Sequence, residues 1–319
     1  MIKYQKNKML LVLLACLIFT SSCNGISAEQ EHGTSTVQDS KKTEKNNQKT
    51  EQIPEETPKE TPEEKENYIK ETGTCLKDRI DVPEGFERVS YQKDSFGTFL
   101  RNYPLCKAGQ PVLFYDGREK GNQNAHVAVF DMDMTDGDLQ QCADSVIRMY
   151  AEYFYQQKKY EKMKFHFVNG FSCDFNKWSK GMRVSVNGND TSWYQGAGAD
   201  DSKDALEGYL RTVFSYASTL SMEQESKPVK MSELKAGDIF IRGGSPGHVV
   251  MVVDVCENEK GEKVFLLAQG YMPAQQFHIL KNPQHEDNPW YYETEVSYPF
   301  HTPEYTFDEG SLMRPEYNR

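Results

Sequence analysis

Three residues in this sequence have the types and the chain order that a thiol-based acyl-transfer reaction requires. Cys142 lies at the start of a predicted helix, His248 opens a Val-rich predicted strand, and Gln269 lies on the next strand. A helix N-terminus favours the thiolate because the helix dipole is positive there. A thiol nucleophile also needs a base, and the base needs a third group that fixes its tautomer. We therefore predict Cys142 as nucleophile, His248 as base and Gln269 as the residue that orients the imidazole.

The stretch GDLQQCADSVIRMYAEYFY predicts the helix that carries Cys142. Its apolar residues recur with a period of 3.6, and Asp136 or Asp138 can cap its start. Cys142 belongs to this apolar stripe, so a buried structural thiol is the alternative interpretation. A second amphipathic helix is predicted over SKDALEGYLRTVFSYASTLSMEQ, started by Ser202.

The stretch GDIFIRGGSPGHVVMVVDVCENEKGEKVFLLAQGY predicts an antiparallel meander of three strands. A turn centred near Glu259 places His248 opposite Gly270, and a register one residue different places it opposite Gln269. The histidine and the amide are therefore expected to meet at one end of neighbouring strands. Further upstream, PVLFYDG and AHVAVFDMDM lie on either side of REKGNQN and predict a hairpin.

The motif GDIFIRGGSPGHVVMVV resembles the histidine motif of NlpC-type cell-wall peptidases, which are papain-like enzymes. In that family a helix starts at the cysteine and packs on an antiparallel sheet, and the histidine opens a strand in a GHV setting. The resemblance implies an α+β fold, in which an antiparallel sheet packs against a central N-terminal helix carrying Cys142. The long separation between Cys142 and His248 implies inserted helices. The family usually reads Asp-Cys-Ser-Gly at the nucleophile, whereas this chain reads Gln-Cys-Ala-Asp.

Five further stretches resemble the domain of unknown function 4846 family, from about residue 80 to 316. They are FGTFLRNYPL, YDGREKGNQNAHVAV, DLQQCADSVIRMYAEY, LLAQGYMPAQQFHIL and TPEYTF. This resemblance implies an exported bacterial lipoprotein. It implies no chemistry, because that family has no assigned activity.

Four other residues are candidates for binding at the same site. His126 begins a strand that should neighbour the site, and it is an alternative base. Gln141, or Gln140 before it, could donate to an oxyanion together with the backbone amide of Cys142. Tyr271 and Trp290 could line a groove for a sugar or a peptide, with core packing as the alternative for such aromatic side chains.

The N-terminal residues predict export and lipid attachment. Residues 1–22 contain three lysines and an apolar run that is too short to span a bilayer, as in a lipoprotein signal peptide. Small residues directly before Cys23 predict lipidation of that cysteine, and cleavage of an ordinary signal near Ala28 is the alternative. Asn24 after Cys23 favours the outer membrane. Residues 23–72 predict a lipidated, disordered tether with few large apolar residues, and residues 73–319 predict a single folded α+β domain.

Charge and cysteine content limit the partners. The formal charge of −11 argues against nucleic acid as a partner. Five cysteines remain besides Cys16 and Cys23, so at least one thiol is unpaired, and Cys75 and Cys106 could form a disulfide. No C-x-x-C or H-x-x-x-H spacing indicates a metal, and no cofactor is expected. The oligomeric state stays open.

These features predict a membrane-tethered cysteine hydrolase that acts on amide bonds of cell-wall or peptide substrates. The tether favours the cell wall, because an anchored, exported domain meets that polymer first. The alternative is a non-catalytic envelope lipoprotein that binds glycan, peptide or protein in the same cleft, as the altered nucleophile motif suggests. Acyl transfer through the same thioester is a third interpretation, since only the accepting nucleophile differs.

Overall fold

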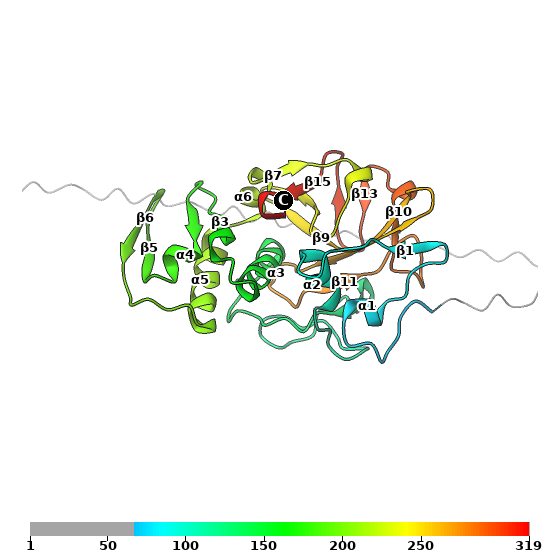
Figure 1. Ribbon diagram of the computed structural model, residues 1–319, viewed down its shortest axis with the longest axis horizontal. Helices are drawn as coiled ribbons and strands as arrows, with labels where there is room; N and C mark the ends of the chain where they lie inside the picture. Colours follow the sequence, from blue (N-terminus) through cyan, green and yellow to red (C-terminus); the bar gives the residue numbers. More distant parts are fainter. Residues whose placement is uncertain (1–66, 319) are drawn as a thin grey trace, which may run out of the picture. The chain divides into compact units, whose positions relative to one another are not determined.

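Residues 67–318 are described by a computed structural model. The predicted signal peptide, the predicted lipidation site Cys23 and most of the predicted tether lie outside these residues. The described chain combines helices with an antiparallel sheet, so its fold is α+β as predicted (Figure 1). Within residues 67–318 no helix has the length and apolar character to cross a membrane.

A nine-stranded antiparallel sheet forms the centre of the described residues. Its main strands follow the order β2-β11-β10-β9-β8-β15-β7, while β1 also pairs with β9 and β12 with β10. The strands are β1 (Phe86–Arg88), β2 (His126–Val129), β7 (Ser226–Pro228), β8 (Ile239–Arg242), β9 (His248–Asn258), β10 (Lys263–Gln269), β11 (His278–Leu280), β12 (Tyr291–Tyr292) and β15 (Leu312–Pro315).

The predicted meander is confirmed by β8, β9 and β10, which pair antiparallel in sequence order. Neither predicted register is correct near the turn, because Val255 lies opposite Phe265. A β-bulge between Leu266 and Leu267 then shifts the pairing by one residue. This shift alone decides which side chains meet at the far end of the two strands.

The bulge brings the predicted histidine and amide onto one face. Beyond it, Met251 pairs with Ala268. Continuing that register places His248 opposite Tyr271, so that Gln269 is the diagonal neighbour of His248. Diagonal residues of an antiparallel pair lie on the same face within reach of long side chains.

The helix α3 (Cys142–Gln156) begins at the cysteine, several residues later than Asp136 or Asp138 predicted. Gln141 is the N-cap, and the carboxylate of Asp144 accepts a hydrogen bond from the Gln141 backbone N–H at 3.1 Å. This capping box competes successfully with the upstream aspartates. Cys142 therefore lies in the first turn, where backbone N–H groups have no partner within the helix.

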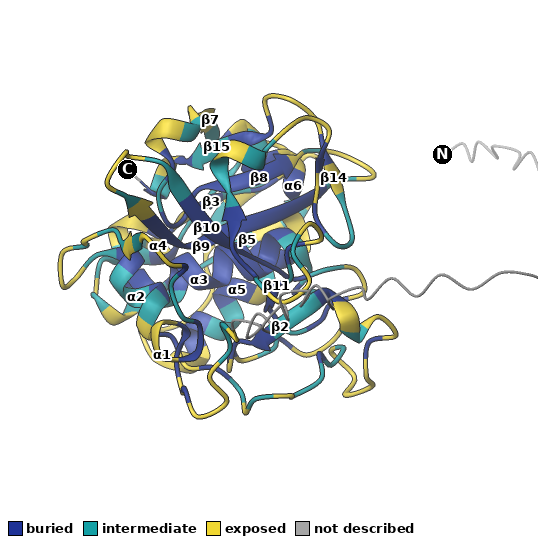
Figure 2. Ribbon diagram, turned by 90° about the vertical axis from the view of Figure 1, so that its right-hand side faces the viewer, coloured by how far each residue is buried: buried dark blue, intermediate teal, exposed yellow. Residues whose placement is uncertain are grey.

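Apolar side chains pack on both faces of the sheet. The face towards α3 carries Val249 and Met251, and the opposite face carries Val250 and Val252 beside Phe307. Figure 2 shows the strands β8, β9 and β10 as buried throughout most of their length. The alternation along β9 follows from the two-residue period of a strand, and it separates the environments of successive side chains.

The chain between α3 and β8 forms additional helices and hairpins, most of which are gathered on one side in Figure 1. Ser202 caps the predicted second helix through the backbone N–H of Ala205, as expected. These elements are β3 (Lys164–His166), β4 (Ser172–Asp174), α4 (Phe175–Trp178), β5 (Met182–Asn187), β6 (Asp190–Gln195), α5 (Lys203–Tyr216) and α6 (Thr219–Gln224).

The predicted hairpin around REKGNQN is wrong. Leu113 forms an isolated bridge with Glu119, whereas β2 pairs with β11, more than a hundred residues downstream. Pairing with β11 buries β2 against the central sheet, which a local hairpin would not achieve. The remaining elements are α1 (Leu76–Arg79), α2 (Phe96–Asn102), β13 (Phe300–His301) and β14 (Thr306–Phe307).

Candidate functional site

His248 and Gln269 meet as predicted. Nε2 of His248 lies 2.8 Å from Oε1 of Gln269, and both side chains are buried. The Gln269 amide nitrogen donates to Oε2 of Glu304 at 2.7 Å and lies 3.4 Å from Nε2 of His278. The amide oxygen of Gln269 is therefore the atom that faces His248.

This arrangement determines which imidazole nitrogen carries the proton. The amide oxygen of Gln269 can only accept a hydrogen bond, so Nε2 of His248 must donate to it. Nδ1 of His248 is then left with its lone pair and can take up a proton. The same division of roles, with one ring nitrogen held and the other free, is what a general base requires.

Cys142 contacts the strand at the residue that follows His248. The backbone amides of Ala143 and Val249 lie close enough to its sulfur to lower its pKa, and the residue is partly buried. Val249 points its side chain into the core beneath α3, whereas His248 projects to the other face. The thiol thus reaches the backbone of β9 at the peptide unit that joins His248 to Val249.

The thiol and the imidazole are both uncharged at neutral pH. Burial, followed by the charge of Asp144, raises the pKa of Cys142 to about 12, although the nearby backbone amides act in the opposite direction. Burial also lowers the pKa of His248 to about 4, although the hydrogen bond that His248 donates to Gln269 acts in the opposite direction, and the charge of Lys120 adds to the lowering. The pair therefore rests as thiol and neutral imidazole, in contrast to an ion pair.

Aromatic side chains enclose the imidazole of His248. The rings of Tyr271 and Tyr305 lie 4.7 and 4.8 Å from it, and Phe307 stacks at 6.1 Å. The hydroxyl of Tyr305 donates to the carbonyl of Pro246 at 3.3 Å, which connects this aromatic wall to the turn before β9. These contacts explain why the imidazole is desolvated and remains neutral.

Asp144 is a second buried ionisable group in the first turn of α3. One carboxylate oxygen caps Gln141, and the other is buried with no hydrogen-bond partner among the described residues. Burial raises the pKa of Asp144 to about 8, although two backbone hydrogen bonds act against it. Its ionisation would place a negative charge near the Cys142 sulfur and would disfavour the thiolate.

The four additional candidates have different positions. Tyr271 lies beside His248, and Gln141 precedes Cys142, although its amide donates to Asp138 at 3.1 Å. His126 does not reach His248 directly. Its ring lies 5.9 Å from that of His278, and its Nε2 lies 3.2 Å from the backbone carbonyl of Gln110. Trp290, by contrast, lies away from this site.

The Trp290 side chain has no exposed surface, and its indole N–H donates to the Asp81 carbonyl at 2.7 Å. It is therefore a core residue, and it lines no groove. All five cysteines of residues 67–318 are free thiols, including Cys75 and Cys106. Within the same residues, no group of three or more His, Cys, Asp or Glu side chains could hold a metal ion.

Sequence reasoning missed Glu304 and Lys120, which complete the hydrogen-bonded chain behind Gln269. The Lys120 ammonium contacts Oε2 of Glu304, and both side chains are nearly buried. Their only signal in the sequence is a charged residue within otherwise apolar or turn-rich surroundings. The pairing of two residues so distant in the chain could not be recognised without the fold.

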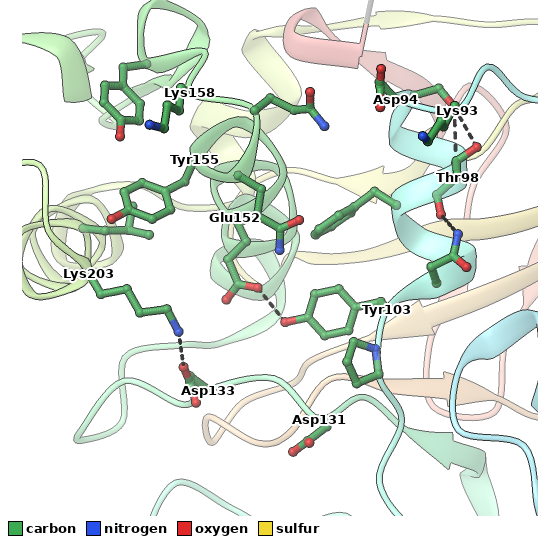
Figure 3. Close-up of a pocket in the computed structure, with 18 of the residues that line it drawn as sticks. Lys93, Asp94, Thr98, Tyr103, Asp131, Asp133, Glu152, Tyr155, Lys158 and Lys203 are labelled. Atoms are coloured by element: carbon green, nitrogen blue, oxygen red, sulfur yellow. Dashed lines mark hydrogen bonds and ion pairs between the residues drawn. The ribbon is translucent and has the colours of Figure 1, made fainter.

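A cleft of about 790 Å³ lies elsewhere, near the C-terminal end of α3 (Figure 3). At its floor, Tyr103 donates to Glu152 at 2.6 Å, and Lys203 and Asp133 form an exposed ion pair at 3.8 Å. Glu152 is ten residues after Cys142, or about 15 Å along the helix. This cleft is therefore separate from the site of Cys142 and His248.

The sequence matches one known protein family. The sequence profile described as "Domain of unknown function (4846)" matches residues 76–314. The match covers most of the chain, so this protein belongs to that family. No curated protein and no solved structure matches the chain.

Proposed function

We propose that this protein is a cysteine hydrolase that cleaves amide bonds, with a papain-like arrangement of the NlpC type. The observation that carries the proposal is the oriented imidazole of His248. Gln269 holds Nε2 at 2.8 Å, which leaves Nδ1 as the proton acceptor, and the thiol of Cys142 lies beside the backbone amide of the next residue. The thiol approaches β9 from the α3 side and the imidazole projects to the other face, so the proposed reaction requires a rearrangement that turns the two groups toward each other. A thiol, a base and an orienting amide are thus present at one end of β9 with distinct roles.

In the proposed reaction, Nδ1 of His248 takes the thiol proton as the Cys142 sulfur attacks the carbonyl carbon of the amide. A carbon–sulfur bond forms, and the carbonyl becomes an oxyanion. The imidazolium then returns the proton to the leaving amine as the carbon–nitrogen bond breaks. Water attacks the resulting thioester by the reverse proton transfers, which releases a carboxylic acid and restores the thiol.

The first turn of α3 can stabilise the oxyanion. The backbone N–H groups of Cys142 and Ala143 belong to the unpaired donors of a helix N-terminus and lie near the sulfur. Because the thiol rests in its neutral form, proton transfer to His248 must accompany the attack. This requirement makes the orientation of the imidazole more important than it is for a preformed thiolate.

The proposed substrates are amides of the cell wall or of its stem peptides. An exported chain, anchored by lipid on Cys23 in the cell envelope and directed to the outer membrane by Asn24, would meet this polymer. Sugar or peptide next to the amide can contact Tyr271, which is partly exposed beside His248. Aromatic side chains provide contact area for such ligands.

The test uses the purified full chain with soluble murein fragments, and mass spectrometry identifies the cleaved bond. Cys142→Ala should reduce the rate by about 1,000-fold or more, since the nucleophile is lost. Cys106→Ala is the matched control, because Cys106 is also a partly buried free thiol. Equal rates for the wild type and Cys142→Ala, or no cleavage by the wild type, would contradict the proposal.

A second candidate function is ligand binding without reaction. The observation that favours it is the raised pKa of Cys142 together with the lowered pKa of His248. In that case the chain would bind glycan, peptide or protein near Tyr271 and leave it uncleaved. Binding of murein fragments with equal affinity to the wild type and Cys142→Ala, without turnover, would favour this second function.

A further inference from the structure

We infer that Glu304 is the positioning residue that holds the amide of Gln269 in the orientation His248 needs, with Lys120 as its counter-ion. The inference rests on the proposed function for its catalytic meaning. Its structural part does not depend on that function, because it concerns which of two orientations the Gln269 amide adopts. Glu304 touches neither Cys142 nor His248 through its carboxylate and acts only through Gln269.

The two orientations of the Gln269 amide differ in what they offer to His248. In the observed one, Oε1 faces Nε2 of His248, and the NH₂ group faces Glu304 and His278. Nδ1 of His278 lies 2.9 Å from the carbonyl of Gln276 and donates to it, so Nε2 of His278 is also an acceptor. The NH₂ group thus has two acceptors for its two hydrogens.

Rotation of the amide by 180° would reverse these roles. The amide oxygen would face the Glu304 carboxylate and the lone pair of His278, which are acceptors like itself. The NH₂ group would face His248, whose Nε2 would then have to accept, so the ring proton would move to Nδ1. The base would be lost, because Nδ1 could no longer take the proton of the thiol.

Glu304 is the stronger of the two acceptors, because a hydrogen bond to a carboxylate is charge-assisted. Its other oxygen accepts from the Asn122 side chain at 3.2 Å, and Lys120 contacts the oxygen that binds Gln269. Lys120 and Glu304 are 7 % and 13 % exposed. The ammonium of Lys120 pairs with this nearly buried carboxylate, compensates its desolvation and holds it beside the Gln269 amide.

The loop that carries Glu304 also contacts the imidazole of His248. Glu304 and Tyr305 lie at the tip of the β13–β14 hairpin, and the Tyr305 ring contacts His248. The Tyr271 hydroxyl donates to the backbone carbonyl of Glu304 at 3.4 Å. The hairpin tip thus joins the Gln269 amide, the Tyr271 ring and the His248 ring, and residues 302–305 determine the orientation of the base.

The experiment measures the His248 tautomer and the reactivity of Cys142 in the full chain. Nitrogen-15 NMR of labelled histidine rings distinguishes Nδ1–H from Nε2–H. Iodoacetamide alkylation of Cys142, followed by peptide mass mapping, reports base assistance without any substrate. The variants are Glu304→Ala, Glu304→Gln and Lys120→Met, and Glu309→Ala is the control from an exposed position of the same C-terminal segment.

Glu304→Ala should populate the Nδ1–H tautomer and slow Cys142 alkylation at pH 7 by about tenfold or more. Glu304→Gln should stay within about threefold of the wild type, because its amide oxygen still accepts from Gln269. Lys120→Met should resemble Glu304→Ala, and Glu309→Ala should resemble the wild type. The ring signals of the other histidines verify folding, and Lys120→Met and Glu304→Gln decide the matter if Glu304→Ala unfolds.

Wild-type tautomer and alkylation rate in folded Glu304→Ala or Lys120→Met would overturn the inference. Failure of the proposed hydrolase has a different signature. The wild type would then cleave no murein fragment, whereas the tautomer would still respond to Glu304. Conversely, murein cleavage that depends on Cys142 but not on Glu304 would retain the hydrolase and reject Glu304 as a positioning residue.

Discussion

Gly270 and Ser145 approach each other so closely that a Cβ atom on Gly270 would lie 2.4 Å from Oγ of Ser145 and 3.0 Å from the Gln141 carbonyl. The residue after β10 thus supports the first turn of α3. Because the same turn carries Cys142, this contact sets the height of the thiol above β9.

Gly270→Ala should therefore displace the start of α3. We expect a loss of about 1–3 kcal/mol in the free energy of unfolding from overpacking. Murein cleavage should fall up to about 100-fold, since a shift of about 1 Å at a reacting group has effects of that size. Adding Ser145→Ala should recover part of both losses, and Gly198→Ala, with open space around its Cβ, is the control. Full activity in Gly270→Ala would contradict this role.

The reaction should depend on pH with limits near 4 and near 8. As pH falls through about 4, His248 is protonated and can no longer accept the thiol proton. As pH rises through about 8, Asp144 ionises and its charge disfavours the thiolate of Cys142. The rate of murein cleavage should therefore be bell-shaped between these values.

Asp144→Asn separates the two limits. The amide oxygen can still cap Gln141, but the side chain no longer ionises, so the decline above pH 8 should disappear and the decline near pH 4 should stay. The same profile can be measured by Cys142 alkylation. An acid limit near pH 6.5 would contradict the lowered pKa of His248. An alkaline decline that remains in Asp144→Asn would show that Asp144 does not cause it.

Asp144→Asn should also change how stability varies with pH. The folded pKa of Asp144 is raised to about 8, so the folded chain binds a proton that the unfolded chain releases above about pH 4. Its contribution to stability is therefore present at low pH and is lost as pH rises through 8. Denaturant unfolding should show that Asp144→Asn is more stabilising, relative to the wild type, at pH 8 than at pH 5.

Lys158 has a φ of 54° at the end of α3, the left-handed region that favours glycine. Its N–H and that of Lys159 bond back to the last turn, as in a glycine-type C-cap. Lys158→Gly should therefore raise the free energy of unfolding by about 0.5–1 kcal/mol. Lys158→Ala, which keeps the Cβ, is the control and should gain nothing. An equal gain in both variants would assign the effect to the lysine side chain.

Asp254 is fully buried between two arginines, with Nε of Arg88 at 2.8 Å and Nε of Arg101 at 2.6 Å. Asp254→Ala leaves both guanidinium groups without this carboxylate, so we expect a loss of about 3–5 kcal/mol in the free energy of unfolding. Asp136→Ala removes a 98 % exposed partner of Arg211 and should cost less than about 0.5 kcal/mol. Similar losses in both variants would contradict the role of burial.

The sequence predicted the helices and strands of the site that are determined by short-range patterns of apolar residues. The 3.6-residue period located α3 and α5, and the apolar runs located β8, β9 and β10. The meander predicted that His248 and Gln269 lie at one end of neighbouring strands, but both predicted registers were wrong. The bulge between Leu266 and Leu267 puts the two side chains on one face, and no pattern in the sequence predicted it.

Long-range pairing accounts for what the sequence did not predict. β2 joins β11 instead of a local partner, and β15 and β7 extend the sheet from the C-terminal part of the chain. Glu304 lies between two strands of only two residues, too short for any periodic pattern. For Trp290 both a groove position and core packing were expected, and the structure shows core packing, because a single aromatic side chain gives no sign of its depth.

The order of residues along the chain has a consequence for biosynthesis. Lys120 and Glu304 are 184 positions apart, and Glu304 leaves the ribosome long after Cys142 and His248. A nascent chain therefore carries its thiol while the amide beside the imidazole can still rotate. Under the proposed chemistry, the polypeptide could attack a bond only after its C-terminal segment has been made and has folded against the sheet.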